Sequence, residues 1–415
     1  MATTRSARRN IVFVLLCFLG MAILLVLARL SQSRGPILEP ESPDVAAFRL
    51  DRERNAWYAL QDAVQLLPPL PPAVQLPGGP GGRYVRQYEP APESLASMVW
   101  ATRPDDAVLL DYVAKCRPAI DKVRDALLKP DLMFPMTDDA DERRQQSWQA
   151  LARLTILLEA TARVEAASPG RGGEVAGLIR DALRLEYMIS SDCYPYCRQL
   201  ASELVRLFRS MGPRRLRQTL DWLVLFRQSL RPLTRCAERA IRQLDVQQPD
   251  VDWVWVRRHP TQAVGYALAE SRQKAALRRY HDAYIAAAGV EYYRLPEFEK
   301  QHPGLKTIPD EVRLLTYRQL SHVHSQWLAQ IDGLAIAAAL ELYRRNNGQY
   351  PESLELLQPY FVRIPIDPFT GKPFIYRREG ADYVLYACGT DQKDSGGASD
   401  IIIRRAPAPA EVASG

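Results

Sequence analysis

The stretch Gly333-Leu-Ala-Ile-Ala-Ala-Ala-Leu-Glu-Leu-Tyr-Arg-Arg345 is an apolar run that predicts a helix. The following Asn346-Asn347-Gly348 ends this helix, since Asn and Gly tolerate the left-handed conformation that a helix C-terminus needs. The next segment, Gln349-Tyr-Pro-Glu-Ser-Leu-Glu-Leu-Leu357, predicts a second, short helix with Pro351 in its first turn. These residues therefore predict a helical start to the C-terminal part of the chain.

A small sheet is expected directly after these helices. Asp367-Pro-Phe-Thr-Gly-Lys-Pro373 is a cluster of turn-forming residues. Three short strands are predicted beyond it, at residues 374–377, 383–388 and 400–404. The last two strands are separated by residues 389–399, a loop rich in carboxylates and glycines.

This order of motifs resembles the C-terminal domain of the major pseudopilin of type II secretion systems. The resemblance covers roughly the last fifth of the chain. It implies an α+β module, in which the loop before the last strand holds a structural Ca²⁺ ion. By resemblance, Asp391 and Asp400 supply carboxylates and Cys388 supplies a backbone carbonyl, with Asp394 as a further candidate. Hard oxygen ligands on a flexible, Gly-containing loop are what Ca²⁺ requires, but a solvated loop without an ion is the alternative.

The N-terminal residues predict a membrane anchor. Residues 1–10 form a basic segment, and residues 11–30 form an apolar run of about the length that spans a bilayer as a helix. A cleaved signal peptide is the competing interpretation, but Ala28-Arg29-Leu30 is a poor cleavage site. The arginines before the run favour a cytoplasmic N-terminus. We therefore expect a single-pass protein of the bacterial inner membrane, with most of the chain in the periplasm.

Between the anchor and the C-terminal module, the sequence predicts a linker at residues 31–46 and an all-helical region at 47–310. Apolar residues recur there at helical spacing, as in a bundle or a tetratricopeptide-like array. Helices are predicted at 48–67, 93–128 (a pair), 147–167, 174–189, 197–211, 216–230, 235–244, 262–289 and 312–329, with a loop at 292–306. The long helix and the pseudopilin-like module occupy 311–405, and a disordered tail is expected at 406–415. The predicted fold class is thus mainly α, with a small α+β module and a three-stranded antiparallel sheet.

Charge and cysteine content narrow the functional classes. The chain of 415 residues carries a net charge of +6, but its arginines are scattered among acids and form no basic stripe with stacking aromatic residues. We therefore expect no nucleic-acid binding. Of its six cysteines, Cys193 and Cys197 are close enough in sequence for a local disulfide, and two free thiols are the alternative.

The sequence contains none of the common catalytic motifs. It contains no G-x-S-x-G, H-E-x-x-H, Walker or Rossmann pattern. We therefore expect no enzyme, but an extracytoplasmic structural or interaction protein with protein partners, in a secretion or pilus-related assembly as the resemblance implies. The alternative is a helical scaffold that binds a peptide or envelope protein, with the C-terminal module only a cap. A hydrolase would instead require a deep polar pocket in the helical region.

Overall fold

The computed structural model describes residues 51–68, 102–129, 132, 140–168, 171–192, 200–230, 258, 262, 283, 286–287, 289–303, 317–396 and 400–404. The chain divides into two compact units. The larger unit comprises Glu41–Cys236, Ala288–Leu295 and Arg318–Gly415, and it contains every site discussed below. The main described element of the smaller unit is the helix α14 (Leu295–Gln301), which begins at the last residue of a segment of the larger one.

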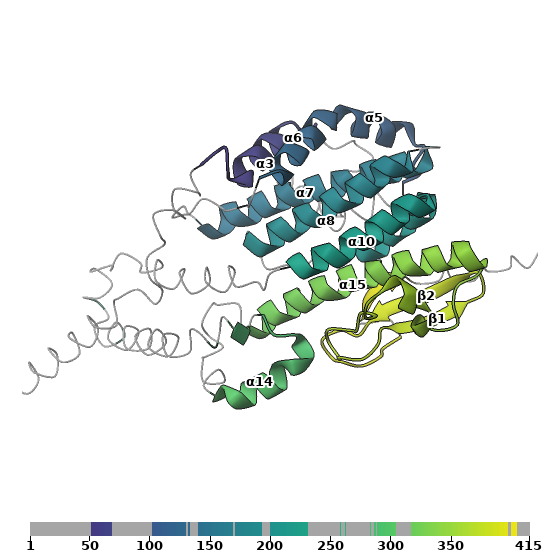
Figure 1. The fold of residues 1–415 in the computed structure, drawn as a ribbon. Helices are drawn as coiled ribbons and strands as arrows, with labels where there is room; N and C mark the ends of the chain where they lie inside the picture. The colour runs from purple at the N-terminus through teal and green to yellow at the C-terminus, as the bar shows by residue number, and fades with distance from the viewer. Residues whose placement is uncertain are drawn as a thin grey trace, which may run out of the picture. The chain divides into compact units, whose positions relative to one another are not determined.

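The N-terminal part of the larger unit is a layered array of helices (Figure 1). Its elements are α3 (Ala56–Gln65), α5 (Ala107–Lys115), α6 (Arg117–Leu127), α7 (Ala140–Ala167), α8 (Gly172–Asp192), α9 (Ala201–Leu204), the 3-10 helix η2 (Val205–Ser210) and α10 (Pro213–Ser229). Helix α3 packs on α6, α7 on α8, and α8 on α10. Leu, Ile, Val and Ala side chains fill the spaces between them.

Most of the helices predicted within the described residues are confirmed, with shifted ends. The side chain of Asn55 accepts a hydrogen bond from the amide of Trp57 (3.1 Å) and so fixes the start of α3 at Ala56. The single helix predicted at 197–211 is wrong, because the short α9 tightens into η2 there. The helices predicted at 235–244 and in most of 262–289 lie outside the described residues.

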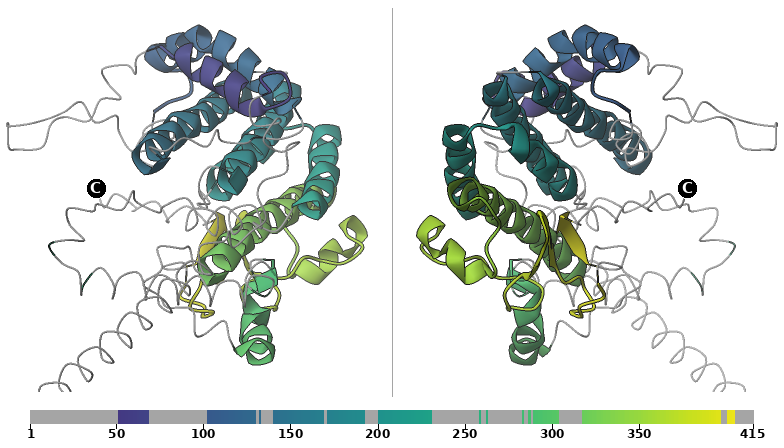
Figure 2. Two further views of the ribbon diagram at one scale, coloured as in Figure 1. Left: turned by 90° about the vertical axis from the view of Figure 1, so that its left-hand side faces the viewer. Right: turned by 90° about the vertical axis from the view of Figure 1, so that its right-hand side faces the viewer.

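The central element of the C-terminal part is the long helix α15 (Tyr317–Asn347). The helices predicted at 312–329 and 333–345 are one continuous helix. It ends as the sequence predicts, since Gly348 follows it with a φ of 78°. Both views of Figure 2 place the yellow strands of the sheet against α15. Gly333 permits this contact, because a Cβ atom built there would lie 2.5 Å from Cγ1 of Ile403 in the sheet.

The predicted three-stranded antiparallel sheet is confirmed, in the order β1-β2-β3. Its strands are β1 (Ile375–Glu379), β2 (Asp382–Ala387) and β3 (Ile401–Arg404). β1 and β2 form a hairpin that pairs Glu379 with Asp382, and the pairing of β2 with β3 contains an irregularity at Leu385/Tyr386. The inner face of the sheet is buried, with Leu385 and Ile403 fully covered.

Two local predictions are wrong. The segment 351–357 does not begin a helix at Pro351; the 3-10 helix η5 (Leu354–Tyr360) starts after an extended Ser353. The carbonyls of Tyr350 and Pro351 instead accept hydrogen bonds from Arg378 (3.2 Å) and Tyr376 (2.7 Å) of β1, which holds this backbone extended. The loop predicted at 292–306 contains the 3-10 helix η3 (Tyr292–Arg294) followed by α14.

Several predictions concern parts of the chain beyond the described ranges. The predicted anchor at 11–30, the linker, the boundary at residue 310, the tail and the pair Cys193/Cys197 all lie there. Among the helices that the structure does describe, none combines the length and the hydropathy needed to cross a bilayer. Cys116 and Cys388 are buried free thiols.

Candidate functional site

The residues predicted to hold Ca²⁺ lie at the end of β2, in the loop that follows it and just before β3. Cys388 is buried at the end of β2, and its amide donates a hydrogen bond to the Asp367 carboxylate (3.0 Å). Asp391 is exposed, and its carboxylate accepts a hydrogen bond from the amide of Lys393 (3.2 Å). The structure thus engages both residues in contacts that shape the loop.

The other two predicted ligands also have partners within the module. The Asp394 carboxylate accepts hydrogen bonds from the Tyr386 hydroxyl (2.7 Å) and the Gly396 amide (3.0 Å), and the bond from Tyr386 is the main cause that lowers the pKa of Asp394. Asp400 is buried, and its Oδ2 accepts a hydrogen bond from Ser395 (3.1 Å). Across the described residues, no group of three or more His, Cys, Asp or Glu side chains is arranged to hold a metal ion. The Ca²⁺ site remains a prediction.

Asp367 organises this end of the module and was not predicted as a functional residue. Its carboxylate is buried and accepts hydrogen bonds from the amide of Phe369 (2.8 Å), the hydroxyl of Thr370 (2.9 Å) and the amide of Cys388. Burial raises the pKa of Asp367, and these hydrogen bonds oppose the rise. The residue therefore ties the turn at 367–373 to the end of β2, which is a structural role.

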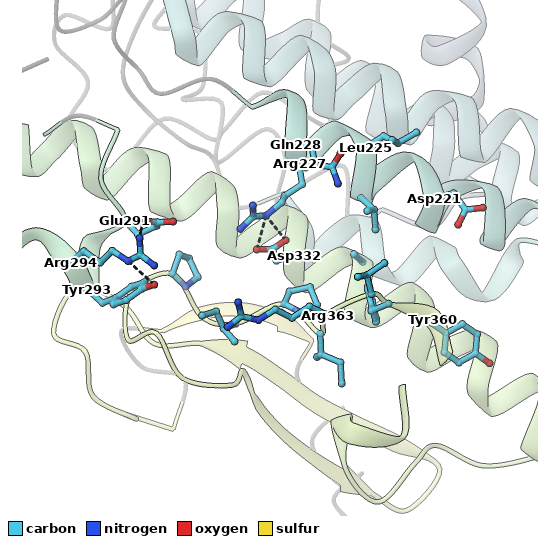
Figure 3. Close-up of a pocket in the computed structure, with 18 residues that line it drawn as sticks. Asp221, Leu225, Arg227, Gln228, Glu291, Tyr293, Arg294, Asp332, Tyr360 and Arg363 are labelled. Atoms are coloured by element: carbon cyan, nitrogen blue, oxygen red, sulfur yellow. Dashed lines mark hydrogen bonds and ion pairs between the residues drawn. The ribbon is translucent and has the colours of Figure 1, made fainter. Parts of the chain in front are cut away.

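A groove of about 680 Å³ opens in the larger unit. It lies between α10, residues 291–294 around η3, α15 and the segment that links η5 to the sheet (Figure 3). Its lining is mainly apolar, with a few charged groups: Asp221, Val224, Leu225, Arg227, Gln228, Glu291, Tyr293, Arg294, Asp332, Ala335, Tyr360, Phe361, Val362, Arg363, Ile364, Pro365, Ile366 and Pro368. A mostly apolar pocket of this size with a few polar groups is typical of a binding site.

The pair Arg227–Asp332 joins α10 to α15 in the wall of the groove. The Nε atom of Arg227 donates to both carboxylate oxygens of Asp332, at 3.1 and 3.3 Å. Asp332 is only 3% exposed, and burial raises its pKa to about 6 although the guanidinium opposes this. In Figure 3 the pair stands between the labelled residues of η3 and those near Tyr360. A buried acid with a raised pKa in a cavity marks a candidate functional site.

Aliphatic side chains border the groove on the solvent side. Val362 is fully exposed and the side chain of Leu225 is 64% exposed. Arg363 is exposed next to Val362, and in Figure 3 its side chain runs below the Arg227–Asp332 pair. None of the described lining residues is Ser, Thr, Cys or His.

The sequence contains one faint signal for this site. Asp332 is an acid inside a long apolar run, next to the glycine that contacts the sheet, and a charge at such a place calls for a partner. The partner, Arg227, lies more than 100 positions away on α10, one of many arginines on helix faces. The rest of the wall comes from residues 291–294 and 360–368. No sequence pattern indicates that these two segments lie close together.

Comparisons of the protein with protein-family models, with curated proteins and with solved structures find no match.

Proposed function

We propose that this protein is a non-enzymatic extracytoplasmic interaction protein, held at the bacterial inner membrane by residues 11–30, that captures a protein partner through the groove. Its pseudopilin-like C-terminal module, with Ca²⁺ in the loop before the last strand, favours a role in a secretion or pilus-related assembly. The observation that carries the proposal is an open groove whose walls come from both the helical layer and the module.

The module is built into the helical layer by side chains of α15. The amide oxygen of Gln330 accepts hydrogen bonds from the amides of Leu200 (2.6 Å) and Ala201 (3.1 Å), and so caps the start of α9. At the other end of α15, Arg345 donates to the carbonyls of Phe208 (3.1 Å) and Arg209 (3.2 Å) of η2. These contacts favour a shared binding face over a module that only caps a helical scaffold.

The sheet makes a further contact with the same region. The Asp382 carboxylate accepts two hydrogen bonds from Arg404 (2.7 and 2.8 Å) and lies 3.2 Å from Arg209 of η2. Burial raises the pKa of Asp382, but the bonds from Arg404, the hydrogen bond from the Tyr383 amide and the charges of Arg404 and Arg209 together outweigh it, so the pKa is lowered. Asp382 is therefore an ionised link between the hairpin and the helices. A deletion of residues 333–415 would cut α15 and break these links, so point changes test the function more sharply.

Photo-crosslinking from the groove tests the capture of a partner. The full-length protein is produced in bacterial membranes with benzoylphenylalanine in place of the fully exposed Val362, or in place of Leu128, which is 83% exposed and lies after α6. We expect a discrete protein adduct from position 362 only, competed by added unlabelled protein. Identical adducts from both positions, or none from position 362, would count against the proposal.

Membrane extraction tests the location. The full-length protein should stay in the membrane pellet at alkaline pH, and a variant without residues 1–30 should be released. Protease added to spheroplasts should digest the bulk of the full-length protein. Release of the full-length protein at alkaline pH, or protection from protease, would contradict the predicted anchor or its orientation.

A further inference from the structure

The groove is lined by three acids and three arginines, and one of these arginines has no acid to pair with among the described residues. Asp332 pairs with Arg227 (3.1 Å) and Glu291 pairs with Arg294 (3.7 Å). Asp221 pairs with Arg217 (3.1 Å), which lies one turn earlier on α10 and outside the lining of the groove. Arg363 lines the same groove, and the described part of the protein provides no ion pair or hydrogen bond to its guanidinium. Among the described residues, Arg363 is therefore the lining arginine whose charge has no acidic partner.

Arg227 adds hydrogen-bond donors beside this charge. Its contact with Asp332 uses the Nε atom alone. Within the described residues, the two Nη atoms donate to no acceptor, and the side chain of Arg227 is 45% exposed. A guanidinium has five N–H donors in a planar fork that matches a carboxylate. Arg227 is thus held by a buried acid, while its outer edge remains open to a ligand.

The apolar lining indicates what surrounds the ligand's charge. Leu225, Val362, Ile364 and Ile366 line the same groove as the two guanidiniums, and burial of aliphatic surface is the main favourable term in most association. The volume of about 680 Å³ has room for two or three side chains of a peptide but not for a folded domain.

We propose that this groove binds a peptide segment that carries a carboxylate next to an aliphatic side chain. The carboxylate pairs with the open edges of Arg227 and Arg363, and the aliphatic group covers Leu225 and Val362. The carboxylate belongs either to an acidic side chain or to the C-terminus of a polypeptide, since both have the same chemistry. The inference rests on the proposed function and names the chemical class of the captured partner.

Synthetic peptides test the inference on the full-length protein in detergent, by fluorescence polarisation. The probes are labelled Gly-Ser-Val-Leu with a free C-terminus, the same peptide with a C-terminal amide, and labelled Gly-Ser-Leu-Glu-Leu-amide, which carries its carboxylate on a side chain. We expect at least one carboxylate probe to bind about tenfold more tightly than the neutral amide. Binding should weaken as salt is raised.

Two charge reversals provide the matched control. Arg363→Glu should reduce carboxylate-probe binding at least about tenfold, because it replaces the unneutralised cation with an anion. Arg214→Glu changes the net charge equally, on an exposed part of α10 that does not line the groove, and should leave binding unchanged. Both sites are exposed, so both variants should fold with the circular dichroism of the parent.

Equal binding of the neutral and both carboxylate probes, no binding of any probe, or equal binding by the two variants would each overturn the inference. Failure here can be told apart from failure of the proposed function. If no probe binds but the adduct from position 362 persists, the proposed function stands and the ligand class is wrong. If the carboxylate probes bind but no adduct forms, the groove binds carboxylates without capturing a protein.

Discussion

The stability of the protein should depend on the protonation of Asp332. The pKa of this carboxyl is about 6 in the folded protein, against an ordinary value of 3.8. The folded state therefore binds this proton more tightly than the unfolded state does, so ionisation of Asp332 lowers the free energy of unfolding as the pH rises from about 4 to 7. A difference of about two pH units corresponds to about 3 kcal/mol at about 1.4 kcal/mol per unit.

The variant Asp332→Asn isolates this effect, because it removes the titrating group and keeps its size. The neighbouring His324 titrates in the opposite sense, since burial lowers its pKa to about 4, but it is present in both proteins and cancels in the difference. Urea unfolding at pH 4, 5, 6 and 7 should show the stability of the parent relative to Asp332→Asn falling by about 2 kcal/mol over this range.

The exposed Asp221 supplies the control for this experiment. Asp221→Asn removes a carboxylate of the same groove that is 57% exposed in its pair with Arg217, and it should change the free energy of unfolding by less than about 1 kcal/mol. A stability difference between the parent and Asp332→Asn that stays constant from pH 4 to 7, or rises with pH, would refute the reasoning from burial.

Three further predictions concern the links between the parts of the larger unit. Gly333→Ala should lower the free energy of unfolding by about 1–3 kcal/mol through overlap with Ile403, despite the better helix propensity of Ala, and the cost should vanish in an Ile403→Ala background. Arg345→Ala should lower the free energy of unfolding, measured with urea, by about 2–4 kcal/mol, because the carbonyls of η2 lose their hydrogen-bond donor. Equal stability of the variant and the parent would contradict the capping role. For the predicted Ca²⁺ site, Ca²⁺ at about 100 times its Kd should raise the free energy of unfolding by about 2.7 kcal/mol. A chelator or Asp391→Ala should remove this gain. A Tm that does not respond to chelator would exclude a stabilising ion.

The helices and the sheet were largely predictable because their signals are local. Short apolar runs bounded by turn residues predicted the three strands to within two residues, and Gly348 predicted the end of α15. The errors at Pro351 and at 292–301 arise where contacts with distant residues replace local preference. The side chains of Tyr376 and Arg378 donate hydrogen bonds to the backbone carbonyls just before η5. At residues 292–301, the amide of Tyr292 donates a hydrogen bond to Ser325 of α15 (3.2 Å).

The groove was not predictable, since it exists only after folding. Its walls come from four separate segments, and which of its arginines lacks an acidic partner depends on which acids meet which arginines in the folded protein. The identity of Arg363 as the cation left over follows from three ion pairs, one of them between α10 and α15. The predicted Ca²⁺ ligands could be named from a motif, but the structure shows how each is already engaged in the loop.

The cap that Gln330 places on α9 also bears on how the protein is made. The first amides of α9 receive their acceptor from a residue about 130 positions later in the sequence. During synthesis, α9 therefore emerges long before its cap, and this contact can form only once α15 has been made. A chaperone that shields the nascent helices during this interval should therefore raise the yield of the full-length protein.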